Sequence, residues 1–202
     1  MSNILYFILI VTFFVSPIND PCSEFNLEAK RKISELKNIS YKLKNPEYFT
    51  KNELLSVVLP EYVMYDKFTN YIEKAYTKFT YNLNFDAWYN TSIGPFQMTP
   101  NFISNCIVKS DPGIIEDPLF LHVYMNNHKA IVENFEYFTS IKIQWEILSL
   151  FERIYIAESN GDINYLRNIY HSGDNYSYEF SKINCQKKKY KDWSDYLKSY
   201  LD

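Results

Sequence analysis

A single carboxylate behind an apolar stretch is the first candidate for chemistry in this chain. Residues 54–59 are almost wholly apolar, which predicts a buried helix, and Pro60 and Glu61 follow directly. Burial raises the pKa of a carboxyl group because the charged form loses hydration, and a carboxyl with a raised pKa can donate a proton near neutral pH. Glu61 is therefore a candidate general acid. The alternative is that its side chain turns outward into solvent.

The second candidate is a short loop at residues 92–100, with the sequence Ser-Ile-Gly-Pro-Phe-Gln-Met-Thr-Pro. Gly94 permits a tight turn or the close approach of a ligand. The two prolines restrict the backbone and predict a rigid loop that leads into a helix over residues 100–108. Gln97 carries an amide that can both donate and accept hydrogen bonds. The pattern is compatible with a site for a polar ligand, and equally with a well-packed turn.

The composition limits the functions to be considered. The 202 residues are 47% hydrophobic, which is enough for one domain with a real core. A net charge of −3 gives no indication of nucleic-acid binding. The 19 tyrosines suit contacts with sugars or peptides, because the ring packs while the hydroxyl forms hydrogen bonds. The alternative is that the abundance of Tyr, with that of Asn, Lys and Ile, is a compositional habit of the source genome. Three scattered histidines and three cysteines match no metal site, and we expect no metal and no cofactor.

The N-terminus predicts export. Residues 4–15 are almost continuously apolar but too short to span a bilayer comfortably, and a Ser-Pro pair then breaks the run. We expect a signal peptide over residues 1–21, a single domain over residues 22–202, a secreted or periplasmic location, and no stable membrane span after cleavage. A short N-terminal anchor is the alternative. Export permits a disulfide, and Cys106–Cys185 is the expected pair.

Hydrophobic periodicity predicts a mainly α domain. Thr50 and Glu53 form a capping box before the buried helix. Residues 67–81 form an amphipathic helix with Glu73 off its apolar stripe and exposed, and residues 82–90 form a loop or short hairpin. Further helices are expected over residues 27–43, 119–138 (irregular, in two pieces), 141–157, 163–170 and 192–201.

Three sequence features follow one another along the chain. They are Glu61, the loop Gly-Pro-Phe-Gln-Met-Thr-Pro at residues 94–100, and the segment Ile-Tyr-His-Ser-Gly at residues 169–173. This order resembles the lysozyme-like superfamily, and most closely its lytic transglycosylase branch. The sequence Leu-Pro-Glu-Tyr at residues 59–62, followed by Ser-Ile-Gly-Pro-Phe-Gln-Met at residues 92–98, also resembles an exported lysozyme-like group from Bacteroidetes. In that family a catalytic Glu precedes a Gly-Leu-Met-Gln-x-Met-Pro loop, and an Ala-Tyr-Asn-x-Gly motif follows on a later helix. The resemblance covers residues 50–175 and implies a lysozyme-like helical domain with a small loop or hairpin region.

The resemblance implies cleavage of the MurNAc-GlcNAc bond of peptidoglycan, or of a related N-acetylated glycan, without a cofactor. Glu61 would protonate the glycosidic oxygen and then, once ionised, remove the proton of the muramyl 6-hydroxyl. Tyr170 would orient the acid or the leaving oxygen. A hydrolytic variant would need a second carboxylate, for which Asp86 is the candidate. The residues alone do not decide between the two outcomes.

The remaining site residues follow from the same motifs. Gln97 and the backbone near Met98 would hold the N-acetyl group or the sugar hydroxyls. Gly94 and Phe96 belong to the same loop and are expected at the substrate. His171 stands where the family has Asn, beside the motif tyrosine.

The identity of the acid stays open at this point. The separation between Glu61 and Gly94 is longer than in ordinary transglycosylases and must contain an extra helix. Glu73 is the competing candidate, and Glu47 is a more distant one.

Departures from the family pattern leave other functions open. Tyr62 stands where the family has Ser, Thr99 replaces the second Met of the loop, and His171 replaces Asn. These differences allow a catalytically degenerate module that binds a glycan or a protein. A third possibility is an unrelated secreted helical protein, in which Glu61, Gln97 and Tyr170 would not share a cleft.

Overall fold

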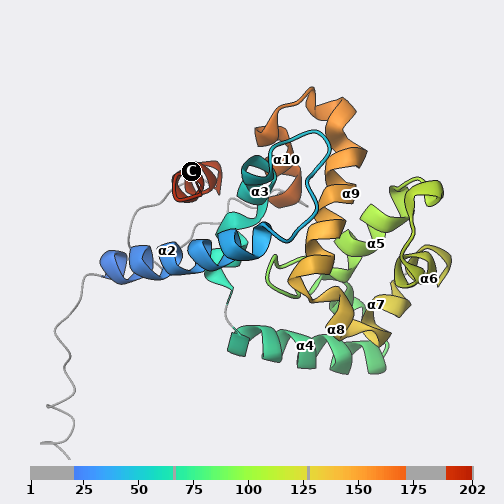
Figure 1. Ribbon diagram of the computed structural model, residues 1–202. Coiled ribbons are helices and arrows are strands. Elements are labelled where there is room, and N and C mark those ends of the chain that lie inside the picture. Colours follow the sequence, from blue (N-terminus) through green and yellow to red (C-terminus); the bar gives the residue numbers. More distant parts are fainter. Residues whose placement is uncertain (1–20, 66, 127, 172–189, 202) are drawn as a thin grey trace, which may run out of the picture.

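The computed structural model describes residues 21–65, 67–126, 128–171 and 190–201 (Figure 1). Residues 1–20 of the predicted signal peptide lie outside these residues, as does the end of the 169–173 motif. Cys106 is a free, buried thiol, and Cys185, its expected partner, lies outside the described residues. No described helix has the length and apolarity needed to cross a bilayer.

The described chain is mainly helical, which confirms the predicted mainly α class. The elements are α2 (Pro21–Ser40), α3 (Lys51–Met64), α4 (Lys67–Asn82), η1 (Asp86–Asn90), α5 (Pro100–Lys109), η2 (Pro112–Ile114), α6 (Pro118–Asn126), α7 (Lys129–Glu133), α8 (Phe135–Phe138), α9 (Ile141–Ser159), α10 (Ile163–His171) and α11 (Tyr190–Lys198). The irregular stretch at residues 119–138 forms three short helices rather than two. The described residues contain no strand, only one isolated antiparallel bridge between Ile93 and Met98.

The hairpin alternative for residues 82–90 was wrong. The segment turns at Asn84, whose φ is +56°, and then forms the 3-10 helix η1. It contains no glycine for a tight hairpin turn. Trp88 of η1 is buried edge-on against Tyr81 and beside His128, so packing of this ring fixes the segment.

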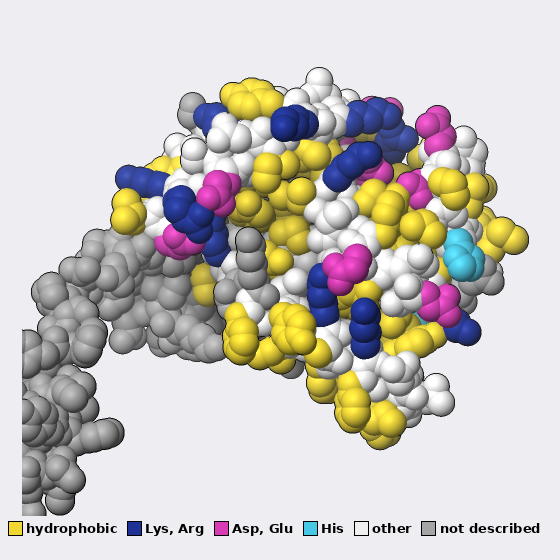
Figure 2. All heavy atoms as spheres, turned by 60° about the horizontal axis from the view of Figure 1, so that its bottom comes forward, with side chains coloured by type: hydrophobic (Ala, Val, Ile, Leu, Met, Phe, Trp, Pro, Cys, Tyr) yellow, Lys and Arg dark blue, Asp and Glu magenta, His cyan; other side chains and the backbone are white. Residues whose placement is uncertain are grey.

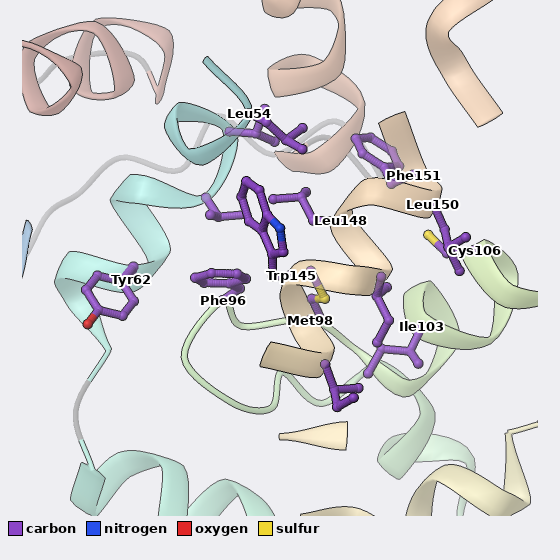
Figure 3. Packing of buried hydrophobic residues seen from close by; sticks show 14 of the residues in the cluster. Leu54, Tyr62, Phe96, Met98, Ile103, Cys106, Trp145, Leu148, Leu150 and Phe151 are labelled. Carbon is purple, nitrogen blue, oxygen red and sulfur yellow. The ribbon is translucent and has the colours of Figure 1, made fainter. Parts of the chain in front are cut away.

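The core gathers around α9, which runs through the middle of the molecule (Figure 1). Trp145 of α9 is buried, and its indole N–H donates to the carbonyl of Lys44 at 2.9 Å. Figure 3 shows Phe96 and Met98 reaching from their loop toward Trp145, and both are almost fully buried. The loop therefore packs against the core through Phe96 and Met98, two apolar side chains at alternate positions.

Two buried charged groups hold α3 against its neighbours. The carboxylate of Glu152 on α9 accepts hydrogen bonds from the backbone N–H groups of Tyr48 and Phe49, at 2.9 and 2.7 Å, just before α3 begins. On the other side, Arg167 of α10 donates to the hydroxyl of Ser56 on α3 at 2.7 Å. These contacts fix α3, α9 and α10 relative to one another.

Helix α4 faces the opposite way from the expected orientation. Its apolar stripe is exposed, with 70% of Phe68, 71% of Tyr71 and 61% of Phe79 accessible to solvent. Figure 2 shows hydrophobic side chains gathered along the lower edge of the molecule, on the side where α4 lies in Figure 1. The polar stripe faces inward because it supplies partners to the loop: Asn70 is buried and accepts a hydrogen bond from the N–H of Gly94 at 3.0 Å.

Candidate functional site

A cleft of about 1020 Å³ lies between α3, α4, α5, α9, α10 and the loop before α5. This volume is at the upper end of the range for ligand pockets and suits an extended ligand. Five of the predicted site residues line it together, although up to 110 positions separate them in the sequence: Glu61, Gln97, Met98, Tyr170 and His171.

Glu61 lies in the last turn of α3, at the edge of this cleft. Its side chain is 29% exposed, and the buried residues Val57 and Val58 belong to the preceding turn. Burial raises the pKa of its carboxyl from the ordinary 4.5 to about 7, and the neighbouring carboxylate of Glu73 adds to the effect. The predicted desolvation of this group is therefore found. Nδ1 of His171 lies 4.0 Å from Oε1 of Glu61.

Glu73 also lines the cleft, so the expectation that it is exposed was wrong. Burial raises the pKa of its carboxyl, and a long hydrogen bond of 3.4 Å from Nε2 of Gln97 opposes that rise. A signal for this position was present in the sequence. Asn70, Thr77 and Thr80 recur with Glu73 at helical spacing, and this stripe is the buried face of α4.

The loop before α5 is a tight turn with two residues in the left-handed region. The N–H of Ile93 donates to the carbonyl of Met98 at 2.9 Å, and the N–H of Gln97 donates to the carbonyl of Gly94 at 3.0 Å. Gly94 has φ +72° and Gln97 has φ +54°. Such a φ is strained for glutamine and persists because the surrounding contacts impose it.

Gln144 of α9 holds this loop by hydrogen bonds to its backbone. The sequence analysis did not identify this residue. Its fully buried amide accepts from the N–H of Phe96 at 2.7 Å and donates to the carbonyl of Ile93 at 2.7 Å. A Cβ atom on Gly94 would lie 2.3 Å from Nε2 of Gln144. The close approach that Gly94 permits is thus made by this amide.

Two loop residues predicted to contact substrate have structural positions instead. Gly94 does not line the cleft; its backbone is committed to Asn70 and to the turn. Phe96 is fully buried, with its ring in an edge contact with Tyr62 at 6.1 Å between centroids. The alternation of side chains along the loop sends Phe96 into the core and Gln97 toward the cleft.

The hydroxyl of Tyr170 holds the loop rather than the acid. It donates to the carbonyl oxygen of Phe96. Its ring packs against Phe102 and Phe151 at 5.1 and 6.0 Å between centroids. Burial, and then the charge of Glu61, raise the pKa of the phenol well above its ordinary value, so the hydroxyl stays a donor. Tyr170 is a positioning residue that also forms cleft wall.

Asp86, the predicted second carboxylate, is not in the cleft. It opens η1, is exposed, and is not among the lining residues. Trp88, two residues later in η1, is buried, and the side of η1 that carries Asp86 therefore faces solvent.

The described residues contain no group of three or more His, Cys, Asp or Glu side chains that could hold a metal ion. What the cleft does offer is a carboxyl group with a pKa of about 7, which is partly protonated near neutral pH, beside a second carboxylate and an amide. Comparisons of the chain with protein-family models, with curated proteins and with solved structures find no match.

Proposed function

We propose that this protein is a lysozyme-like glycosidase that cleaves the MurNAc-GlcNAc bond of peptidoglycan, with Glu61 as the general acid. The observation that supports it most is the pairing of Glu61 and Glu73 in one extended cleft. Burial raises the pKa of Glu61 to about 7. The order of the motifs along the chain, which resembles the lytic transglycosylases, supplies the substrate class.

In the first step Glu61 donates its proton to the glycosidic oxygen. The bond between that oxygen and the anomeric carbon breaks, and its electron pair leaves with the oxygen. Positive charge then develops on the sugar ring, and the ionised carboxylate of Glu73 stabilises it electrostatically. The two groups are suited to different roles because Glu61 is the more deeply desolvated of the two.

In the second step a nucleophile attacks the anomeric carbon and loses a proton to a carboxylate. Water as the nucleophile gives hydrolysis, and the muramyl 6-hydroxyl gives an anhydro sugar. A second carboxylate in the cleft favours hydrolysis, because it can position water and accept its proton. Glu73 takes the part that the sequence had suggested for Asp86.

We assign recognition of the N-acetyl group to Gln97. Its Nε2 donates to the carbonyl of Gly94 at 2.9 Å and toward Glu73. Its Oε1 accepts no hydrogen bond from the described residues, so it is available to the N–H of an N-acetylated sugar.

Incubation with purified peptidoglycan, followed by mass spectrometry of the soluble products, tests the proposal. Hydrolysis gives muropeptides with reducing ends. A transglycosylase gives products lighter by one water. Binding to peptidoglycan without any release would favour the alternative of a catalytically degenerate glycan-binding module.

Glu73→Gln is expected to reduce the formation of hydrolytic products by about a hundredfold, because the amide can neither stabilise positive charge nor accept a proton. Initial rates of muropeptide release measure this. Glu116→Gln, at an exposed position outside the cleft, is the matched control and keeps full activity. Undiminished release by Glu73→Gln would show that Glu61 works without a second carboxylate.

Gln97→Gly is expected to separate stability from activity. Removing the side chain at φ +54° relieves backbone strain and stabilises the fold by about 1 kcal/mol. The same change removes the amide from the cleft and lowers cleavage about tenfold. Urea unfolding and muropeptide release measure the two effects.

Asn160→Gly is the control for this substitution. Asn160 has φ +48° at the end of α9 and does not line the cleft. Asn160→Gly should gain a few tenths of a kcal/mol in stability, since asparagine tolerates this conformation better than glutamine, and should keep its activity.

The result that would contradict the role of Gln97 is equal activity of Gln97→Gly and the unmodified protein.

A further inference from the structure

The cleft continues beyond the two carboxylates along α5. Asn101, Asn105 and Lys109 recur at every fourth position of this helix, and all three line the cleft. A rise of about 1.5 Å per residue places Lys109 about 12 Å along the helix axis from Asn101. The cleft therefore has an acidic end at α3 and α4 and a basic end at the last turn of α5.

The side-chain amides of Asn101 and Asn105, next to the basic end of the cleft, have hydrogen-bonding groups that are not used within the described residues. Nδ2 of Asn105 donates to Oδ1 of Asn101 at 2.8 Å. Oδ1 of Asn105 and Nδ2 of Asn101 have no partner among the described residues. An acceptor and a donor thus stand side by side, which matches the pattern of a peptide backbone.

Lys109 is the last of these three residues on α5 and the only one that carries a charge. Its ammonium lies 3.4 Å from the hydroxyl of Tyr155 and 5.7 Å from the centroid of that ring. The contact with Tyr155, which also lines the cleft, holds the ammonium beside the cleft wall. No carboxylate of the described residues pairs with Lys109, so its charge is available to a ligand.

We propose that this end of the cleft binds the acidic peptide that peptidoglycan carries on its muramyl sugars, with Lys109 pairing to a peptide carboxylate and Asn101 and Asn105 binding peptide amides. The proposal rests on the proposed function for the identity of the glycan. A carboxylate on the lactyl ether itself stays close to the sugar ring. Lys109 lies about 12 Å beyond Asn101 along the axis of α5, and this separation favours a carboxylate farther out on the peptide.

Calorimetric titration of the full chain with soluble GlcNAc-MurNAc ligands tests this, since these disaccharides lack the scissile bond and are not consumed. Three forms are compared: the disaccharide with its acidic peptide, the same compound with the peptide carboxylates amidated, and the disaccharide without peptide. The unmodified protein is expected to bind the acidic peptide form about fivefold more tightly than the amidated form, as for an exposed ion pair.

Lys109→Glu is expected to abolish this preference or to reverse it, while Lys109→Arg keeps it. Lys42→Glu, the same charge reversal at an exposed lysine outside the cleft, also keeps it. The peptide-free disaccharide should bind equally to all four proteins, which shows that the variants are folded. A lactyl carboxylate as the true ligand would instead make Lys109→Glu weaken the peptide-free form.

The outcomes separate this proposal from the proposed function. An unchanged preference in Lys109→Glu, or no preference in the unmodified protein, would overturn the peptide site even if peptidoglycan is cleaved. A preference that depends on Lys109 without any release of muropeptides would leave the peptide site in place and overturn the enzyme. Absence of binding to all three ligands, together with no release of muropeptides from peptidoglycan, would overturn both.

Discussion

Glu61→Gln is expected to reduce the release of muropeptides from peptidoglycan by about a thousandfold. Glutamine occupies nearly the same volume but has no acidic proton to transfer to the glycosidic oxygen, and general acid catalysis contributes about 10²- to 10⁴-fold to such reactions. The unmodified protein should also lose activity as the pH rises through about 7, because the carboxyl group of Glu61 ionises there. Initial rates over a pH series measure both effects.

A stability measurement separates loss of chemistry from loss of structure. The pKa of Glu61 is raised from 4.5 to about 7 on folding, so the folded state binds more protons than the unfolded state between these values. Stability must therefore fall as the pH rises from 4.5 through 7, by at most about 3 to 4 kcal/mol for this group.

Glu61→Gln should remove that decline and be the more stable protein at pH 8. Urea unfolding of both proteins at pH 4.5 and pH 8 measures the difference. Parallel stability curves would mean that Glu61 is solvated and ordinary, and the acid would have to be sought at Glu73.

Gly94→Ala is expected to destabilise the fold by about 4 kcal/mol or more. The new Cβ would stand 2.3 Å from Nε2 of Gln144, and φ is +72°. Gln144 is fully buried and bonds both Ile93 and Phe96, so moving its amide would leave two backbone groups without partners. Thermal or urea unfolding measures the loss.

Gly161→Ala is the matched control for this substitution. Gly161 has φ +77° but no atom within 4 Å of an added Cβ, so only the strained dihedral remains. It should lose about 1 kcal/mol. Equal losses in the two variants would show that the clamp by Gln144 contributes little, and that the loop is held by its own turn.

The sequence by itself determined the local features. The capping box at Thr50 and Glu53 lies at the start of α3, Thr99 and Pro100 begin α5, and the left-handed Asn160 ends α9, because each depends on neighbours within a few residues. The desolvation of Glu61 was also predictable, since the apolar turn before it belongs to the same helix.

Only the tertiary structure decided which groups share the cleft. Periodicity identified the apolar stripe of α4 but not that its polar stripe would face inward. That orientation depends on the bond between Asn70 and the backbone of Gly94. It brings Glu73 into the cleft, while the packing of Trp88 leaves Asp86 outside.

The same holds for the groups that shape the loop. Gln144 and Tyr170 bond the backbone of Phe96 across 48 and 74 positions of the chain, and neither contact follows from a local pattern. A buried backbone N–H or carbonyl must find a partner somewhere. Which side chain provides it is determined by how the helices pack, and this packing sets the geometry in which Glu61 and Gln97 meet a ligand.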